Sequence, residues 1–140
     1  MTRVVEARSV SAALDRRLDP ASSAPLAVAF SGGADSLLTL LAARAWADRH
    51  GRAVLALTVD HRLQAASAGW TRHCAEVAAR IGADFRALAW DGPKPAAGLP
   101  AAARQARHRL LSEAARAAGA RVMLFGHTAS DIAEGELMRA

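Results

Sequence analysis

Short apolar runs alternate with longer helical segments along this 140-residue chain, and that order limits the fold more than any other feature. Strands are predicted where Val, Leu, Ala and Phe gather, at 26–30, 53–59, 85–90 and 122–125, the third being the most amphipathic. Helices are predicted around them, at 4–18, 36–50, 67–81, 99–118 and 129–140. Apolar strands separated by helices are typical of α/β proteins, so we expect a doubly wound parallel sheet with helices on both faces.

The two ends of the chain carry different signals. Asp19-Pro20 ends the first helix, because the residue before a proline is disfavoured in the helical region. The last helical pattern continues to Ala140 without a cap or stop signal. We therefore expect residues 1–24 to form an N-terminal helix and lead-in. Residues 25–140 are expected to form one catalytic domain, truncated before its last strand.

Composition excludes several classes of protein. Cys74 is the single cysteine, so neither an internal disulfide nor a Cys-rich metal cluster can form. No apolar run approaches the roughly 20 residues that span a bilayer, and the start lacks a signal-peptide core, so a cytoplasmic location is expected. The net charge of +5 suits nucleic acid or nucleotide, but it equally suits a solvated Arg-rich surface.

The segment Ser31-Gly32-Gly33-Ala34-Asp35-Ser36 joins the first predicted strand to the helix that follows it. Ligands of doubly wound sheets bind at this position, beyond the carboxyl ends of the strands. Two glycines allow a tight turn, and the helix start adds free N–H groups and a positive dipole end. Ser31 and Ser36 add hydroxyl groups, and Ser36 is a candidate N-cap. The segment therefore predicts a phosphate-binding loop, with an unliganded Gly-rich turn as the alternative.

Asp35 gives this loop an unusual charge. A carboxylate beside phosphates is repulsive unless a cation lies between them, so Asp35 implies Mg²⁺. The loop lacks the Gly-Lys-Ser/Thr ending of a Walker A motif, and it is not a GxGxxG dinucleotide motif.

The SGGxDS pattern resembles the signature of the PP-loop ATP pyrophosphatases, which cleave ATP between its α and β phosphates. Further segments, from about residue 26 to the end, are similar to the tRNA(Ile)-lysidine synthetases of that group. These segments are Val59-Asp60-His61-Arg62-Leu63 with Ser67; Asp91-Gly92-Pro93-Lys94-Pro95 with Gly98-Leu99 and Ala103-Arg104-Gln105-Ala106-Arg107; and Gly126-His127-Thr128-Ala129-Ser130-Asp131 with Glu134. The combination is more specific than any one segment.

Two of these segments supply candidate contacts to nucleotide or RNA. Asp60 and His61 follow a strand beside the loop and could contact adenosine or its ribose; a capping Asp and a surface His are the alternative. Arg104 and Arg107 lie three apart on one helix and could clamp phosphate or a tRNA backbone, unless they only form a solvated face. Lys94 could contact ATP or tRNA, or neither.

The third segment supplies a candidate acid–base and metal cluster. His127 follows an apolar strand, where an imidazole could stabilise an α-phosphate under attack. Asp131 and Glu134 could hold Mg²⁺, and Asp131 is the better candidate. Acidic residues are also common in first helical turns for dipole reasons alone.

The resemblance implies an α/β PP-loop catalytic domain of an ATP-dependent ligase. ATP would bind at residues 31–36 with Asp60 and His61, and Mg²⁺ would bind at Asp35 and Asp131. Catalysis would depend on Asp35, Arg104 and His127. The implied substrates are tRNA(Ile) and free lysine, which is joined to C2 of the wobble cytidine through an adenylylated base, with release of AMP and pyrophosphate. The chain could also pair with a second copy of itself as a homodimer.

This sequence also departs from the family pattern. Ser130 replaces the first of two paired acids, Ile132 and Gly135 replace the following Gln and Thr, and Gln64 stands where Arg is usual. Two alternatives follow. One is tRNA thiolation, which typically uses paired cysteines that this chain lacks; the other is a non-catalytic nucleotide-binding module.

Overall fold

The computed structural model describes residues 12–16, 18–60, 67–91 and 97–125. Residues 12–16 are helical, and the remaining elements follow in the order β1 (Leu26–Ala29), α2 (Ala34–His50), β2 (Val54–Asp60), α3 (Ser67–Ile81), β3 (Asp84–Ala89), α4 (Leu99–Ala117) and β4 (Met123–Leu124). The predicted alternation of strands and helices is confirmed, with small shifts at the element ends. The helix predicted at 129–140 lies outside the described residues.

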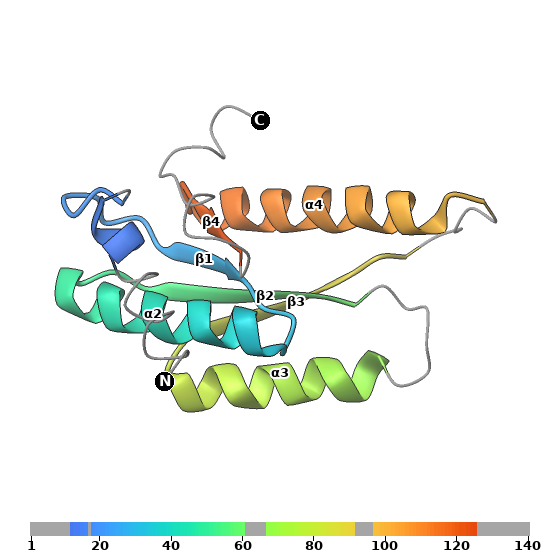
Figure 1. Ribbon diagram of the computed structural model, residues 1–140, viewed down its shortest axis with the longest axis horizontal. Helices are drawn as coiled ribbons and strands as arrows, with labels where there is room; N and C mark the ends of the chain where they lie inside the picture. Colours follow the sequence, from blue (N-terminus) through green and yellow to red (C-terminus); the bar gives the residue numbers. More distant parts are fainter. Residues whose placement is uncertain (1–11, 17, 61–66, 92–96, 126–140) are drawn as a thin grey trace.

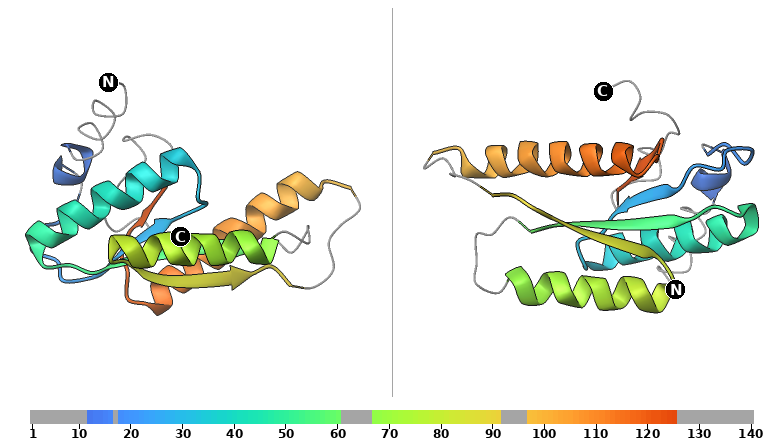
Figure 2. Two further views of the ribbon diagram at one scale, coloured as in Figure 1. Left: turned by 90° about the horizontal axis from the view of Figure 1, so that it is seen from below. Right: turned by 180° about the vertical axis from the view of Figure 1, so that it is seen from behind.

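The four strands form one parallel sheet in the order β3-β2-β1-β4. Helices α2 and α3 cover one face and α4 covers the other (Figures 1 and 2). The chain winds outward from β1 through β2 to β3 and then returns to the other side of β1 with β4. This is the predicted doubly wound fold, and its switch point between β1 and β4 is where such sheets bind ligands.

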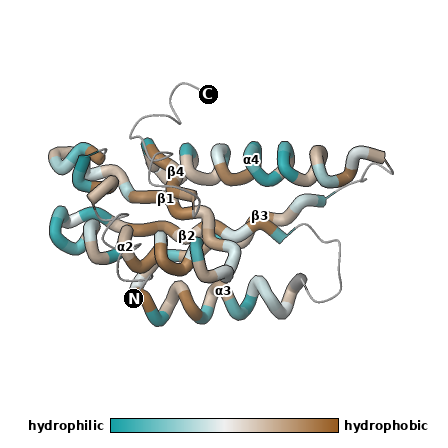
Figure 3. The backbone as a smooth tube through the Cα atoms, viewed as in Figure 1, coloured by the Kyte–Doolittle hydropathy of each residue, from teal (hydrophilic) through white to brown (hydrophobic). Residues whose placement is uncertain are grey.

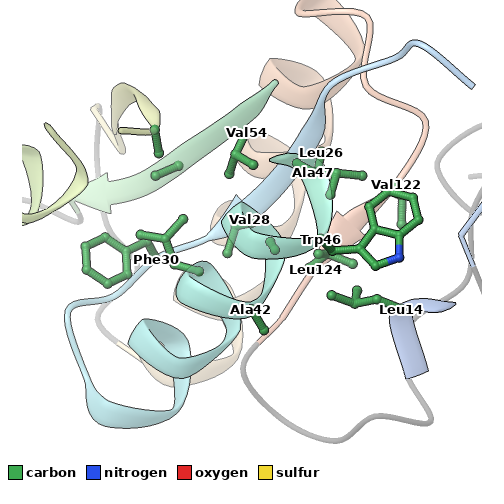
Figure 4. Packing of buried hydrophobic residues seen from close by; sticks show 14 of the residues in the cluster. Leu14, Leu26, Val28, Phe30, Ala42, Trp46, Ala47, Val54, Val122 and Leu124 are labelled. Carbon is green, nitrogen blue, oxygen red and sulfur yellow. The ribbon is translucent and has the colours of Figure 1, made fainter. Parts of the chain in front are cut away.

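The central strand β1 is buried on both faces because its side chains alternate between two cores. Leu26, Val28 and Phe30 join the cluster under α2 and α3, whereas Ala27 and Ala29 join the cluster under α4. Figure 4 shows the first cluster around Val28, Phe30 and Trp46, and Figure 3 shows hydrophobic residues concentrated on the strands. Small residues dominate the second cluster, which allows close approach of α4 to the sheet.

The residues before β1 pack on the same core as the sheet. Leu14 is fully buried, and the neighbouring Asp15 carboxylate accepts a 2.9 Å hydrogen bond from Nε1 of Trp46. The buried Arg52 guanidinium donates to the backbone oxygens of Ala24 at 2.6 Å and Asp19 at 3.2 Å. These bonds fix the lead-in against the turn between α2 and β2.

No helix in the described part of the chain is both long and apolar enough to cross a membrane.

The helix α2 ends at Gly51, whose φ of 65° is left-handed and whose N–H donates to the Ala47 oxygen. A glycine adopts this left-handed conformation without steric cost, which suits it to end the helix.

Candidate functional site

The predicted phosphate loop lies at the carboxyl edge of the sheet. Residues 31–33 lead from β1 into α2, and Ser31, Gly33, Ala34 and Asp35 are all exposed. The loop turns beside the end of β2, where α3 also begins (Figure 1). The first N–H groups of a helix have no partner within the helix, so the start of α2 offers donors and a positive dipole end to an anion.

Hydrogen bonds of two serine side chains link the residues of the loop to one another. The Ser36 hydroxyl donates to the Gly33 oxygen at 3.1 Å and accepts from the Ser31 N–H at 3.2 Å. The Ser31 and Ser36 hydroxyl oxygens are 3.1 Å apart, and the Gly33 N–H donates to the Ser31 hydroxyl at 3.3 Å. These bonds fix the loop in one conformation before any ligand binds.

The prediction that Ser36 is the N-cap of α2 is wrong. The helix begins at Ala34, so the N-cap position falls on Gly33 and no side chain caps the helix. Ser36 is the third residue of the helix, where its hydroxyl donates back to the Gly33 carbonyl instead of accepting from a helix N–H. The helix starts earlier because Ala34 and Asp35 are acceptable residues in a first helical turn.

Gly32 is fixed as glycine by its conformation and by a neighbour that the sequence did not reveal. Its φ is +86°, and the Cβ of an alanine there would lie 2.5 Å from Cζ2 and 2.9 Å from Cε2 of Trp70. Trp70 stands in the first turn of α3 with 50% of its surface exposed. A large tryptophan among small and polar residues at a helix start was the sequence signal that could have indicated this contact.

The structure describes only part of the predicted metal and nucleotide set. Asp35 is exposed in the first turn of α2, and Asp60 ends β2, where its carbonyl accepts from the Trp90 N–H. His61, Lys94, His127, Asp131 and Glu134 lie outside the described residues. Within the described ranges no three His, Cys, Asp or Glu side chains gather as a metal site. An exposed carboxylate beside a phosphate loop has the hard oxygen ligands that Mg²⁺ prefers.

A pocket of about 210 Å³ adjoins the loop. It is lined by Phe30, Ser31, Leu57, Thr58, Val59, Trp70, Arg107 and Leu111. Pockets that enclose a whole drug-sized ligand usually measure about 300–1,000 Å³, so this one would take only part of a nucleotide. Its lining joins the loop to α4 across the end of the sheet.

Of the two predicted arginines, the structure brings Arg107 to this pocket. Arg107 is partly buried, its guanidinium lies 5.7 Å from the centre of the Phe125 ring, and burial lowers its pKa. The group remains a cation at neutral pH because arginine titrates far above it. Arg104 is exposed on the same helix and does not line the pocket. Its predicted catalytic role stays a prediction.

Cys74 lies beneath the loop and supports it by packing. Its side chain is fully buried, and its sulfur would be 3.1 Å from a Cβ on Gly32. Burial raises the pKa of the Cys74 thiol, against a hydrogen bond with the Thr58 side chain that lowers it. Thr58 in turn donates to the Phe30 oxygen at 2.6 Å. The thiol therefore stays protonated and acts as a small apolar group.

We expect iodoacetamide to alkylate Cys74 very slowly in the folded chain, because the thiolate is the reactive form and the sulfur is buried. The pKa of the Cys74 thiol is higher in the folded chain than in the unfolded chain, where it is about 8.5. The free energy of unfolding should therefore be constant below the unfolded pKa and fall as the pH rises through the folded pKa. Mass spectrometry with and without urea measures the alkylation rate, and urea melts from pH 7 to 10 measure stability. Equal alkylation rates in both conditions would contradict the prediction, and Cys74→Ala should lose the extra alkaline sensitivity.

Comparison with known proteins gives consistent results. The family model of the PP-loop domain matches residues 6–140. The tRNA(Ile)-lysidine synthase of Caulobacter vibrioides is 60% identical over 131 residues, covering 94% of this chain and 32% of the relative. The enzyme of the same name from Mesorhizobium japonicum is 49% identical over 113 residues, covering 79% of this chain and 25% of the relative.

A solved structure shares the fold. It is a U34-tRNA thiolase from Methanococcus maripaludis with its 4Fe–4S cluster, which superposes with a TM-score of 0.72 at 12% identity, over 89% of this chain and 46% of that one. This chain spans between 25% and 39% of the length of the curated relatives compared with it. The family match covers nearly every residue and includes the loop described above, so the chain belongs to the PP-loop domain family.

Proposed function

We propose that this chain is the ATP-activating domain of a tRNA(Ile)-lysidine synthetase. The observation that carries the proposal is the loop at 31–36, largely exposed at the start of α2 and joined to a pocket that is lined by the partly buried Arg107. The likeness to relatives of that name supports tRNA as the macromolecular substrate. The net charge of +5 is compatible with an RNA partner.

In the proposed reaction the loop N–H groups bind the phosphates of ATP. The C2 oxygen of the wobble cytidine attacks the α-phosphorus, and the bond to pyrophosphate breaks. The lysine amine then attacks C2 of the adenylylated base, AMP leaves, and the amine loses a proton to solvent. The main task of the protein is to stabilise charge during phosphoryl transfer.

The residues proposed for this work come from several elements. Asp35 and Asp131 would hold Mg²⁺, which neutralises phosphate charge when bound. His127 and Arg107 would contact the α-phosphate, and Arg104 would contact phosphate or the tRNA backbone. Asp60 and His61 would contact the adenosine.

Single substitutions can distinguish the roles of Arg104 and Arg107. Arg107→Ala is expected to lower kcat/KM for ATP by about 100-fold, because it removes a cation from the pocket beside the loop. Arg104→Ala is expected to act mainly on the KM for tRNA, because its side chain is exposed. Steady-state pyrophosphate release measures both. A larger loss of kcat in Arg104→Ala would show that the exposed arginine is the catalytic one.

Incubating the protein with ATP, lysine and tRNA(Ile) tests the function. Pyrophosphate and AMP should be released in equal amounts, and the tRNA should gain the mass of lysine less water. Omission of tRNA should stop the release. ATP binding without lysine-dependent product would refute the synthetase proposal and favour a nucleotide-binding module, whereas sulfur incorporation from a sulfide donor would favour a thiolase.

A further inference from the structure

Trp70 and Trp46 lie in different surroundings. Trp46 is 1% exposed and its N–H bonds to Asp15 within the core. Trp70 is 50% exposed, yet its Nε1 donates a 2.7 Å hydrogen bond to the backbone oxygen of Ser31 in the phosphate loop. An exposed indole contributes less to core stability, so its position calls for another explanation.

The Trp70 side chain provides a hydrogen-bond partner for the Ser31 carbonyl, which lies beyond the last hydrogen bond of the sheet. The β1–β2 ladder ends with the Phe30 N–H donating to the Leu57 oxygen, one residue before Ser31. A strand carbonyl beyond the last ladder bond needs another partner, and the Trp70 N–H supplies it from a different helix.

That bond also orients the next N–H group. In a trans peptide the C=O and the following N–H point in opposite directions, and the described chain has no cis peptide bond. Holding the Ser31 carbonyl toward Trp70 therefore turns the Gly32 N–H away from α3. This N–H has no hydrogen-bond partner among the described residues.

The indole ring restrains the loop as well. It occupies the space that a Gly32 side chain would need, and His73 contacts it with ring centroids 5.0 Å apart. The serine bonds anchor the same loop to α2. The loop is thus held between two helices, with Trp70 as the contact from α3.

We propose that Trp70 is the positioning residue of the phosphate loop, fixing the Ser31–Gly32 peptide so that the Gly32 N–H is presented to a phosphate oxygen. This inference rests on the proposed binding of ATP at the loop. Trp70 acts through the loop backbone and makes no contact with the reacting atoms. Its removal should therefore weaken binding of the phosphates and leave binding of the nucleoside unchanged.

The test compares three ligands by isothermal titration: MgATP, magnesium pyrophosphate and adenosine. Trp70→Phe keeps a ring and loses the N–H, and Trp70→Leu loses both. We expect Trp70→Phe to weaken MgATP and pyrophosphate binding by about tenfold, with a larger loss in Trp70→Leu and adenosine affinity unchanged. Trp46→Phe is the matched control, because it loses an indole hydrogen bond far from the loop.

Tryptophan fluorescence gives a second readout. Pyrophosphate should change the emission of the wild type and of Trp46→Phe, and the change should vanish in Trp70→Phe. Unchanged pyrophosphate affinity in Trp70→Phe would overturn the inference, even if Trp70→Leu fails to fold. Loss of adenosine binding alone would also overturn it, because Trp70 would then contact the base. A wild-type chain that binds neither ATP nor pyrophosphate would refute the proposed function itself.

Discussion

Gly32→Ala is expected to weaken MgATP binding by about 30- to 1,000-fold. The left-handed φ of +86° costs an alanine about 1 kcal/mol or more, and its Cβ would meet the Trp70 ring at 2.5 Å. Overpacking of this kind costs a further 1–3 kcal/mol, roughly, and tenfold in affinity corresponds to about 1.4 kcal/mol. Relief requires a shift of the loop or of the Trp70 ring that holds it, and either shift would misplace the loop N–H groups. Titration with MgATP measures the loss.

Two other glycines separate the causes of this effect. In Gly51→Ala the alanine would have to adopt a similar φ of 65°, but its Cβ would have no atom within 4 Å. This substitution should therefore lower the melting temperature slightly and leave the affinity for ATP unchanged. Gly33→Ala has an ordinary φ of −77° and meets only the Ser31 hydroxyl at 3.5 Å, so its effect on affinity should be small. If Gly32→Ala binds ATP as the wild type does, the proposed loop geometry is wrong.

Asp35→Ala is expected to lower kcat for pyrophosphate release by about 100- to 1,000-fold. Asp35 is the described carboxylate nearest in sequence to the loop glycines, and its exposure in the first turn of α2 suits a metal bound between it and the phosphates. Asp35→Asn should be nearly as inactive, because it keeps the shape and loses the charge. Both variants should require more Mg²⁺ for half-maximal rate.

Asp48→Ala is the control for Asp35→Ala. It removes an exposed carboxylate from the last turns of the same helix, where it pairs with Arg44, and surface pairs contribute little to stability. Its rate and Mg²⁺ requirement should match the wild type. Full activity in Asp35→Ala would eliminate the metal role of this residue.

The strand and helix order could be predicted because each apolar run is local, and because the runs that form β1, β2 and β4 are largely buried. The loop could be predicted because its glycines, serines and aspartate lie within six consecutive positions. The contact between Gly32 and Trp70 could not, because it joins residues far apart in sequence through the packing of α3.

The difference between Arg104 and Arg107 also depends on tertiary packing. Both lie on one side of α4, but only the part of the helix that packs on the sheet is covered, through Leu111, Ala114 and Ala115. The start of α4 extends past the end of β1 (Figure 1). Arg107 lies one turn from Leu111 and reaches the pocket, whereas Arg104 lies nearer the exposed start.

The strand order has a consequence for synthesis on the ribosome. Strand β1 emerges early and pairs on one side with β2, but its other side pairs with β4, through Ala27 and Met123. Until β4 has been translated, one edge of the most buried strand remains open to other chains. The edge of β1 that faces β4 therefore stays open until α4 has been translated, and a chaperone that shields β1 over this interval would raise the yield of folded protein.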